Sequence, residues 1–445
     1  MNENEILQLI EGKKYKQLKN VLSEMNEVDV AEILNPLDPN TTLLIFRMLP
    51  KNLAVDVFAH FSVEQQRDII HAVTDKELNY ILDELFFDDM IDMIEEMPAN
   101  IVSKILENST QEERNLINQF LKYPVDSAGS IMTIEYVELR KSMTVKEALA
   151  HLKKIGLDKE TIYTCYVTDR KRKLHGIVSL RKLVVSDDDI LIEDLMESEA
   201  IFVNTHDDQE TVANVFKKYG FLALPVVDNE NRLTGIITID DIVDVIEQEA
   251  TEDFQRMAAM APSESAYLDT NVFELAKHRI TWLLILMLSA TFTGRIIGKF
   301  NDMLQSIVIL ASFIPMLMDT GGNSGSQSST LIIRGLATGE ISLKDGAKVL
   351  WKEFRVGLLV GITLSLTNFL RLLFLEKVEL LIALTVSLTL IVTVMVAKMI
   401  GGILPIIAKF FKIDPAIMAG PLITTTVDAI SLTVFFTIAT ALLGL

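Results

Sequence analysis

The sequence predicts a multi-domain integral membrane protein, in which an acidic water-soluble part precedes five membrane-spanning helices. Residues 271–445 hold 14 Lys and Arg against 10 Asp and Glu, whereas residues 1–270 hold 27 against 51, so the balances are +4 and −24. Five long apolar stretches follow residue 278, and an internal repeat lies in the acidic part. About 20 apolar residues suffice to span a bilayer as a helix. An acidic body repels phosphates, so we expect no nucleic acid partner.

Residues 1–125 are expected to form an all-α domain, a small superhelix of short amphipathic helices. Apolar residues recur at helical spacing in 55–61, 81–87 and 90–97, and prolines separate the segments. A helix over 88–97 would place Asp88, Asp92 and Glu95 on one face, where like charges at i,i+4 repel by about 0.2–0.5 kcal/mol per pair. A solvated acidic face and a face that binds divalent cations are both open interpretations.

Residues 126–246 contain two copies of one α/β unit. The segment 167–180 aligns with 226–239 at an offset of 59, and 148–154 aligns with 212–218 at an offset of 64. The difference is a longer loop at 156–160 in the first copy. Each copy has the pattern strand, polar turn, strand, helix. The repeat resembles a tandem pair of cystathionine-β-synthase (CBS) domains, at 126–190 and 191–246, and Gly235–Asp241 is its most specific part.

The CBS resemblance implies adenine nucleotides, ATP among them, as candidate ligands. Thr238 and Asp241 match the expected hydroxyl and acid, but Lys182 stands where the first copy would need an acid. A purely structural module therefore remains the alternative. The candidate nucleotide contacts are Arg181, Phe221, Pro225 and Thr238.

We place the membrane spans near 280–298, 306–334, 355–375, 380–408 and 415–443. The N-terminus is acidic and lacks the features of a signal peptide, so we expect it in the cytoplasm and the C-terminus outside. Nine basic residues then lie inside and four outside, which follows the positive-inside rule. The single cysteine, Cys165, permits no internal disulfide.

The second span is unusually polar, because Gly, Ser, Thr, Asn and Gln crowd residues 319–330. Close helix packing through small residues is one interpretation. The other, which the polar density favours, is a broken pore-lining helix whose carbonyls face an ion or its waters. The role of Asp319 stays open.

The fifth span carries Asp428 among apolar residues, and a carboxylate inside a membrane marks a candidate functional site. Pairing with Lys398 or Arg371 is the structural alternative. All six histidines lie at or before His278, so the membrane part offers only oxygen ligands, which suit Mg²⁺ or Ca²⁺. A symmetric dimer would bring two Asp428 side chains together. Candidate supporting pore residues are Gly321, Gly322, Asn323, Thr424 and Thr425.

Taken with the segment 320–327 and Asp414-Pro415, the chain resembles the MgtE family of magnesium transporters along its whole length. The resemblance implies a homodimeric Mg²⁺ channel of the bacterial plasma membrane, with a connecting plug helix at 247–272 and a transmembrane domain at 273–445. Mg²⁺ would be both substrate and regulator, and Asp428 the pore residue. Gly220 departs from the acid that some members carry. The implied regulatory ligands are Asp88, Asp92, Asp208, Glu210, Asp241, Asp244, Glu249, Glu252, Asp253 and Asp414.

Two alternatives remain. Asp319-Thr320-Gly321 matches the triplet of aspartic proteases, in which two carboxylates share a proton, although no second triplet follows and we expect no enzyme. A transporter for Co²⁺ or Mn²⁺, or a carrier coupled to H⁺ or Na⁺, is the nearer alternative, since sequence does not separate a channel from a carrier.

Overall fold

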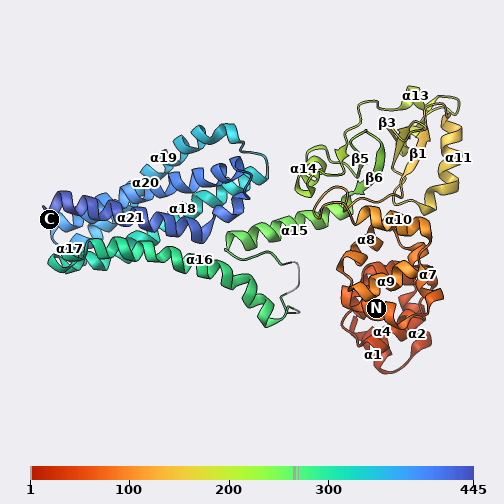
Figure 1. Cartoon of the computed structure of the whole chain (residues 1–445), viewed down its shortest axis with the longest axis horizontal. Helices are drawn as coiled ribbons and strands as arrows, with labels where there is room; N and C mark the ends of the chain where they lie inside the picture. Colours follow the sequence, from red (N-terminus) through yellow and green to blue (C-terminus); the bar gives the residue numbers. More distant parts are fainter. Residues whose placement is uncertain (1–2, 264–266, 269, 445) are drawn as a thin grey trace. The chain divides into compact units, whose positions relative to one another are not determined.

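The computed structural model describes residues 3–263, 267–268 and 270–444. The chain divides into two compact units, Met1–Ile246 and Glu247–Leu445, which are described separately. Their helices and strands are labelled in Figure 1.

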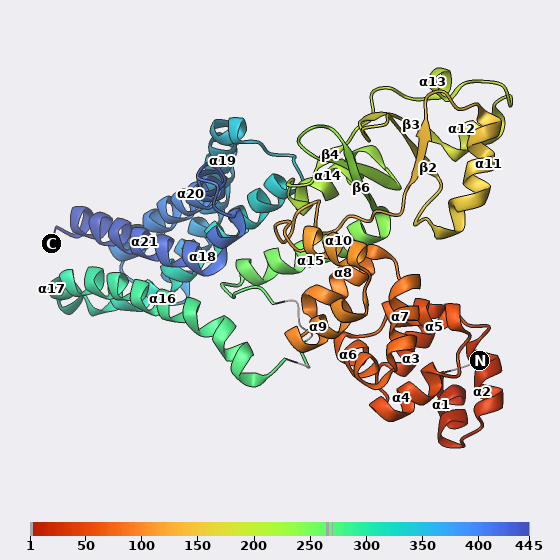
Figure 2. The same cartoon turned by 45° about the vertical axis from the view of Figure 1, so that its right-hand side comes forward.

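Ten short helices form the N-terminal domain and follow one another as a superhelix (Figure 2). From α3 to α9, contacts join each helix to the next but one along the chain, such as α4 to α6, α5 to α7 and α6 to α8. Thr74 and Thr110 form capping boxes that start two of the helices. The bounds are α1 Glu3–Glu11, α2 Tyr15–Leu22, α3 Glu27–Leu34, α4 Pro39–Phe46, α5 Lys51–Ala59, α6 Val63–Ala72, α7 Asp75–Glu84, α8 Phe87–Glu96, α9 Ala99–Asn108 and α10 Gln111–Phe120.

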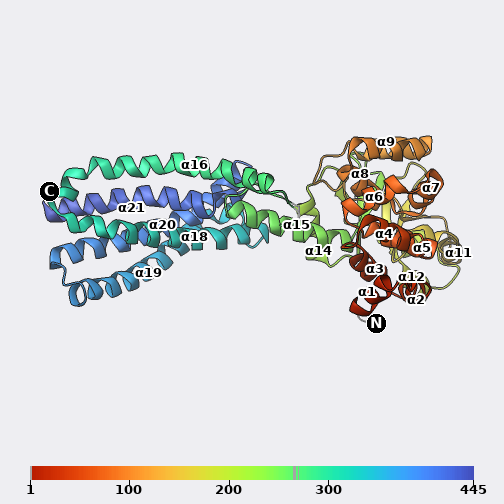
Figure 3. The ribbon, with the colours of Figure 1, turned by 90° about the horizontal axis from the view of Figure 1, so that it is seen from below.

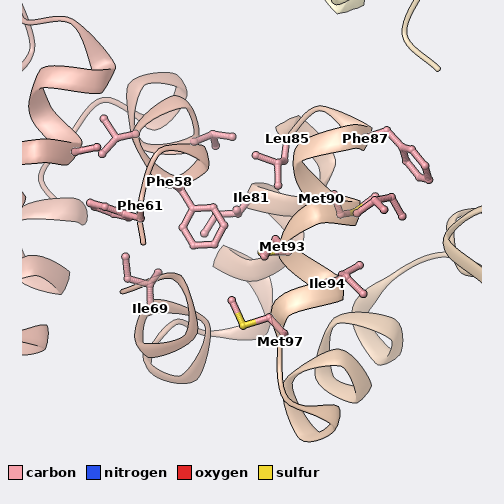
Figure 4. Close-up of a cluster of buried hydrophobic side chains, with 14 of the residues drawn as sticks. Phe58, Phe61, Ile69, Ile81, Leu85, Phe87, Met90, Met93, Ile94 and Met97 are labelled. Atoms are coloured by element: carbon pink, nitrogen blue, oxygen red, sulfur yellow. The ribbon is translucent and has the colours of Figure 1, made fainter. Parts of the chain in front are cut away.

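The buried face of α8 anchors this superhelix. Met90, Met93 and Ile94 are at most 5% exposed, and Met93 points towards Phe58 (Figure 4). The predicted helical segment 81–87 was wrong in one respect, because α7 ends at Glu84 and Leu85 takes an extended backbone before α8 begins. Since its apolar side is fixed in the core, α8 presents its carboxylates on the opposite side.

The two predicted CBS repeats each form a three-stranded sheet, in the orders β1-β2-β3 and β4-β5-β6. Leu139 pairs with Val167 in the first sheet, and Val203 pairs with Val226 in the second. The strand pairings of the two repeats are therefore related by the offsets found in the sequence. The offset is 64 residues for the first strand of each repeat and 59 residues for the hairpin that follows. The bounds are β1 Val137–Arg140, α11 Val145–Ile155, η1 Gly156–Asp158, β2 Thr164–Thr168, β3 Leu174–Ser179, α12 Leu180–Val185, α13 Ile192–Leu195, β4 Val203–Asn204, α14 Gln209–Tyr219, β5 Ala223–Val227 and β6 Leu233–Thr238.

The connecting helix is α15, Ile239–Met257, and it differs from the helix expected over 247–272. It begins as the last helix of the second CBS repeat and ends fifteen residues early. The chain turns because Ala259 takes a left-handed conformation (φ 55°) and Pro262 disfavours helix in the residue before it. Residues 264–266 and 269 of the predicted segment lie outside the described residues. The limits at residues 125, 190, 246 and 272 stay predictions.

Five long helices run side by side in the second unit (Figure 3). α18 contacts α20 and α21, α19 packs on α20, and α16 packs on α21. Within the described residues, four segments are long and apolar enough to cross a membrane: Val272–Lys299, Leu343–Phe374, Leu380–Phe410 and Pro415–Leu443. The bounds are α16 Val272–Lys299, α17 Asn301–Ser306, η2 Val308–Phe313, α18 Ile314–Ala337, η3 Leu343–Asp345, α19 Gly346–Phe374, α20 Leu380–Phe410, η4 Pro415–Met418 and α21 Gly420–Leu443.

The predicted break in the second span is wrong, because α18 is one continuous helix through residues 319–330. The irregular backbone lies elsewhere. The 3₁₀ turn η2 precedes α18, and extended Ala419 separates η4 from α21. The small residues of α18 serve its packing, as the contacts below show.

Candidate functional site: an ion pathway and its acidic regulatory faces

Asp428 lies in α21, and one of its carboxylate oxygens, Oδ1, is buried without a hydrogen-bond partner in the described part of the chain. The alternative pairings are not formed among the described residues: Lys398 Nζ lies 3.4 Å from Gln327 Oε1, and Arg371 pairs with Glu376 at 3.4 Å. A buried acceptor without a partner is costly, so Asp428 is poised for a cation or for water.

Glycines bring α18 into close contact with α20 and α21. A Cβ atom at Gly321 would lie 2.9 Å from Ser431 Oγ, and one at Gly322 would lie 2.8 Å from Thr424 Cγ2. A Cβ at Gly401 of α20 would collide with the Gly325 carbonyl. Packing through small residues therefore describes this helix better than a break does. Gly321 and Gly322 position neighbouring helices.

The opposite face of α18 is polar and exposed. Asp319, Asn323, Gln327, Thr330 and Arg334 recur every three or four residues on this face, which we call the α18 polar stripe. Asn323 Nδ2 donates to Asp319 Oδ1 at 3.1 Å, one helical turn away. A polar stripe on a membrane helix must face water or protein rather than lipid.

The predicted threonines lie on the first turns of α21. The hydroxyls of Thr424 and Thr425 donate to the carbonyls of Gly420 and Pro421, at 3.0 and 2.8 Å. Each hydroxyl oxygen keeps lone pairs that can accept from a hydrated ion. Thr424, Thr425 and Asp428 thus offer only acceptors over one and a half turns of the helix.

The end of α15 is seated on the turn that leads into α21. Met257 belongs to a small apolar cluster with Ile333, Ala416 and Ala419, and its carbonyl would lie 2.7 Å from a Cβ at Gly420. Arg256 forms ion pairs with both Glu252 and Asp414. Asp414 and the connecting helix are therefore in direct contact.

A third carboxylate stands beside these ion pairs. Burial, reinforced by the charges of Asp414 and Glu249, raises the pKa of Asp253 to about 6. The one cation that the structure places here, Arg256, therefore does not remove the repulsion among the acids around it.

In the first unit, carboxylates of α8 meet those at the start of α15. Asp88 is 8% exposed and its Oδ1 has no hydrogen-bond partner among the described residues. Asp241 accepts from the Thr238 hydroxyl at 2.8 Å. The structure thus brings the predicted residues Asp88, Asp92 and Asp241 together, and adds Glu160 and Asp240. We call these five residues the interdomain acid cluster.

The pKa values in this cluster follow from desolvation first and mutual repulsion second. Burial raises the pKa of Asp88 well above its usual range, and Asp241 adds to the effect. Asp92 keeps exposed surface, but desolvation by the surrounding protein, and then the charge of Asp241, raises its pKa to about 7. Burial and the charges of Asp240 and Asp241 raise that of Glu160 to about 7. No salt bridge within the described residues compensates the negative charge of this cluster.

Other predicted regulatory residues lie apart from the cluster. Asp208 caps α14, where its carboxylate accepts from the backbone N–H of Glu210 at 3.0 Å, and Asp244 lies on an exposed part of α15. Among residues 3–263, 267–268 and 270–444, no three acidic, His or Cys side chains are arranged closely enough to hold a metal ion. Bridging by Mg²⁺ would therefore require these acids to draw closer.

Three of the four predicted nucleotide contacts line one cavity of about 580 Å³. Arg181, Phe221 and Pro225 lie on it, together with Tyr163 and Ser179. Thr238 is not part of this lining, and its hydroxyl donates to Asp241 at 2.8 Å, so its contact with a nucleotide stays a prediction. Ser179 occupies the equivalent place in the first repeat, so the cavity takes its hydroxyl from one repeat and Phe221 from the other. Lys182, where an acid was expected, pairs with Glu197 at 2.8 Å.

Several charged residues of the sites escaped the sequence argument. Glu160 lies in the longer loop of the first repeat. The extra length of this loop was the only sequence feature that could have pointed to Glu160. Glu353 is 8% exposed in α19 and accepts from Ser328 Oγ at 2.6 Å. Arg256 had no signal, because a lone basic residue in an acidic helix looks like ordinary solubilising charge.

The comparisons with known proteins agree with this layout. The divalent cation transporter family matches residues 314–438, the MgtE intracellular N domain matches 25–126, and CBS domains match 128–189 and 192–248. The magnesium transporter MgtE of Thermus thermophilus is 37% identical over 96% of this chain and 95% of that protein. The protein of the same name from Bacillus subtilis is 32% identical over 98% of this chain and 96% of that protein.

Two solved structures resemble the first unit. The soluble part of a magnesium transporter gives a TM-score of 0.52 at 31% identity and covers 56% of this chain and 98% of that one. The cytosolic domain of the Mg²⁺ channel MgtE in complex with ATP gives a TM-score of 0.52 at 34% identity. This match covers 55% of this chain and 100% of that one.

A helical N domain, a CBS pair, a connecting helix and a group of long apolar helices together define a divalent cation transporter. The agreement extends over nearly the whole chain rather than over one domain. The chain belongs to the MgtE family of magnesium transporters.

Proposed function

We propose that this protein is a homodimeric Mg²⁺-selective channel for magnesium uptake across the bacterial plasma membrane, closed by Mg²⁺ on its cytosolic side. Magnesium transport follows from membership of the family. The observation that supports the gate is the seating of Met257 and Arg256, at the end of α15, on the Asp414–Gly420 turn. The N-terminus would lie in the cytoplasm and the C-terminus outside.

The proposed pathway runs along α18 and α21. Asp428 supplies a carboxylate whose buried oxygen has no partner within the described chain, and Thr424 and Thr425 supply hydroxyl acceptors. Mg²⁺ gives up its waters reluctantly, so acceptors suit a hydrated ion. One carboxylate neutralises only half of the charge of a divalent ion. The α18 polar stripe also needs water or polar protein beside it. In a homodimer, the second copy of the chain would supply a second Asp428 and a polar neighbour for the stripe.

The proposed gate is the end of α15. While Met257 packs on Ala416 and Ala419, the entrance to α21 is covered by this helix end. Opening would require α15 to leave, which breaks the ion pair of Arg256 with Asp414. A closed state of this kind is stabilised by any cation that relieves the repulsion among Asp253, Glu249 and Asp414.

The proposed sensor is the interdomain acid cluster. At low Mg²⁺ its carboxylates repel one another, and they include Asp88, a buried acceptor without a partner. Mg²⁺ bound between α8 and α15 would favour the arrangement in which these acids lie close. Because the ion binds that arrangement better, it shifts the population towards it. We assign Asp208, Glu210, Asp244, Glu249 and Glu252 to the same regulatory surface.

We further propose that an adenine nucleotide occupies the cavity lined by Arg181 and Phe221. The related cytosolic domain crystallised with ATP supports this assignment. Arg181 offers a planar donor for phosphate oxygens, and Phe221 lies stacked on Tyr219 with ring centroids 5.4 Å apart. The hydroxyl that contacts the ligand would be that of Ser179.

The protease alternative finds no support in the geometry, because the Asp319–Gly321 triplet lies inside a continuous helix with Asp319 bonded to Asn323. A carrier, or a transporter of Co²⁺ or Mn²⁺, remains the second candidate. The test is the reversal potential in proteoliposomes or patches under opposed Mg²⁺ and H⁺ gradients. A channel reverses at the Mg²⁺ equilibrium potential whatever the H⁺ gradient, and a coupled carrier does not.

The same preparation tests the pore residue. Asp428→Asn should reduce the Mg²⁺ current at least tenfold, whereas Asp302→Asn, an exposed acid of α17, should leave it unchanged. Undiminished current in Asp428→Asn would remove the proposed pathway.

A further inference from the structure

A second cavity, of about 520 Å³, lies in the first CBS repeat on residues different from those of the nucleotide cavity. It is enclosed by β1, α11 and the loop that follows α11. Its polar lining consists of Tyr136, Glu138, Arg140, His151, Lys159 and Arg172. This volume falls within the range of small-molecule sites, about 300–1,000 Å³.

The lining is basic although this part of the chain carries a balance of −24. Glu138 is its one acid, and Arg140 Nη1 lies 3.1 Å from Glu138 Oε1, so that charge is compensated. Arg172 donates to the Tyr136 hydroxyl, a neutral group, at 2.7 Å. Within the described chain, neither the Lys159 side chain nor the His151 side chain forms an ion pair or hydrogen bond. The cavity therefore keeps at least two positive charges without a counterion.

The cations are absent from the equivalent places of the second repeat. With the offsets fixed by strand register, Arg140, His151 and Arg172 correspond to Asn204, Val215 and Asn231. Lys159 lies in the loop that the second repeat lacks. Since the second repeat forms the same sheet without these residues, the fold does not require them.

Arg172 also has a left-handed backbone conformation, which asparagine adopts more readily than arginine. Its φ is 62°, and Asn231 has a φ of 61° at the same point of the second hairpin. Asn tolerates the left-handed region better than Arg, because its short polar side chain bonds locally. An arginine retained in such a conformation points to a role of its side chain. That side chain lines the cavity and bonds to Tyr136.

We propose that this cavity binds a small polyanion that carries phosphoryl groups. Arg140 and Arg172 present planar forks that match phosphate oxygens, and Lys159 adds a compact charge that can move to the ligand. Tyr136 places its hydroxyl at the same wall. The ligand is a free phosphorylated metabolite, and it is held by charge rather than by an aromatic platform.

The test is isothermal titration calorimetry of the purified full-length protein with inorganic pyrophosphate, in a metal-free buffer of low ionic strength. Wild type should bind one pyrophosphate per chain. The double variant Lys159→Ala/Arg172→Asn should bind at least tenfold more weakly. Asn is chosen because Asn231 has the same φ, so the hairpin keeps its conformation. Arg172→Lys keeps the charge but loses the planar fork, so it should bind more weakly than wild type and more tightly than the double variant. Lys153→Ala, at an exposed lysine of α11, should match wild type.

A parallel titration with ATP in the Phe221→Ala variant separates the sources of phosphate. ATP binding that persists there and is lost when Lys159→Ala/Arg172→Asn is added would identify a nucleotide as the ligand. Pyrophosphate binding without residual ATP binding would identify a phosphorylated molecule that lacks the base. No binding of pyrophosphate to wild type, equal binding to the double variant, or loss of pyrophosphate binding in Phe221→Ala alone would overturn the proposal.

Discussion

Arg256 and Asp414 form an ion pair across 158 residues of sequence, at the point where the connecting helix meets the turn before α21. The same guanidinium pairs with Glu252 one turn earlier in α15. Both partners were predicted as Mg²⁺ ligands. Arg256 thus supplies a built-in positive charge where the family resemblance implies a regulatory cation.

Removal of this charge should loosen the closed gate when Mg²⁺ is scarce. In Arg256→Gln, Asp414 and Glu252 lose their counterion while Asp253 and Glu249 stay nearby. A pair worth about 1 kcal/mol shifts an open–closed equilibrium by roughly fivefold. We therefore expect a several-fold larger current at nominally zero internal Mg²⁺, measured in inside-out patches. Arg256→Lys, which keeps the charge, is the control, and a smaller current in Arg256→Gln would contradict the assignment.

The α18 polar stripe should be accessible to water. In a Cys165→Ser background, single cysteines at Asn323 and Gln327 should react with a charged methanethiosulfonate reagent, since these positions are exposed on a polar face. Leu359→Cys, 69% exposed on apolar α19, is the matched control and should stay unreactive because lipid excludes the charged reagent. Block of the current by modification at Asn323 would place it beside the ions. Equal labelling at Leu359 would refute the distinction between the two faces.

The contact between Gly325 and Gly401 should tolerate no side chain. Gly401→Ala places a methyl group against the Gly325 carbonyl, and overpacking of this kind costs about 1–3 kcal/mol. We expect a lower melting temperature in detergent and a reduced current. Gly298→Ala in α16 makes the same chemical change where nothing lies within 4 Å, and should be neutral or slightly stabilising. Comparable losses in both variants would show that the close contact between Gly401 and Gly325 is not their cause.

The interdomain acid cluster predicts that stability depends on pH in the absence of Mg²⁺. The pKa values of Asp92 and Glu160 rise from 3.8 and 4.5 to about 7 in the folded protein. The folded state therefore binds more protons between these limits, and stability falls as pH rises from about 4 through 7.

Glu160→Gln checks this sign. At pH 8 it should raise the melting temperature of the first unit by roughly 2–4 °C, which corresponds to about 1 kcal/mol for a domain of this size. It should also flatten the pH profile. Glu107→Gln, outside the cluster, is the control. A melting temperature that increases from pH 5 to pH 8 in wild type would contradict the cluster's electrostatics.

The sequence allowed the succession of domains to be predicted, because charge, hydropathy and the CBS repeat differ sharply along the chain. It did not allow prediction of which face of α18 packs. Gly321 and Gly325 looked like helix breakers, and only the partners on α20 and α21 reveal them as contact points. Glu353 was missed because α19 begins at Gly346, earlier than the apolar stretch suggested. Asp88 and Glu160 are 72 positions apart, and no local pattern could place them together.

The most direct test of the account is the Mg²⁺ dependence of current in inside-out patches of the Asp92→Asn/Asp241→Asn double variant. Its control, Asp29→Asn/Asp83→Asn, makes the same change of charge at exposed sites of α3 and α7. If the interdomain acid cluster senses cytosolic Mg²⁺, the control should close at millimolar-scale internal Mg²⁺ as wild type does, while the double variant keeps conducting. Normal closure of the double variant would contradict the central claim.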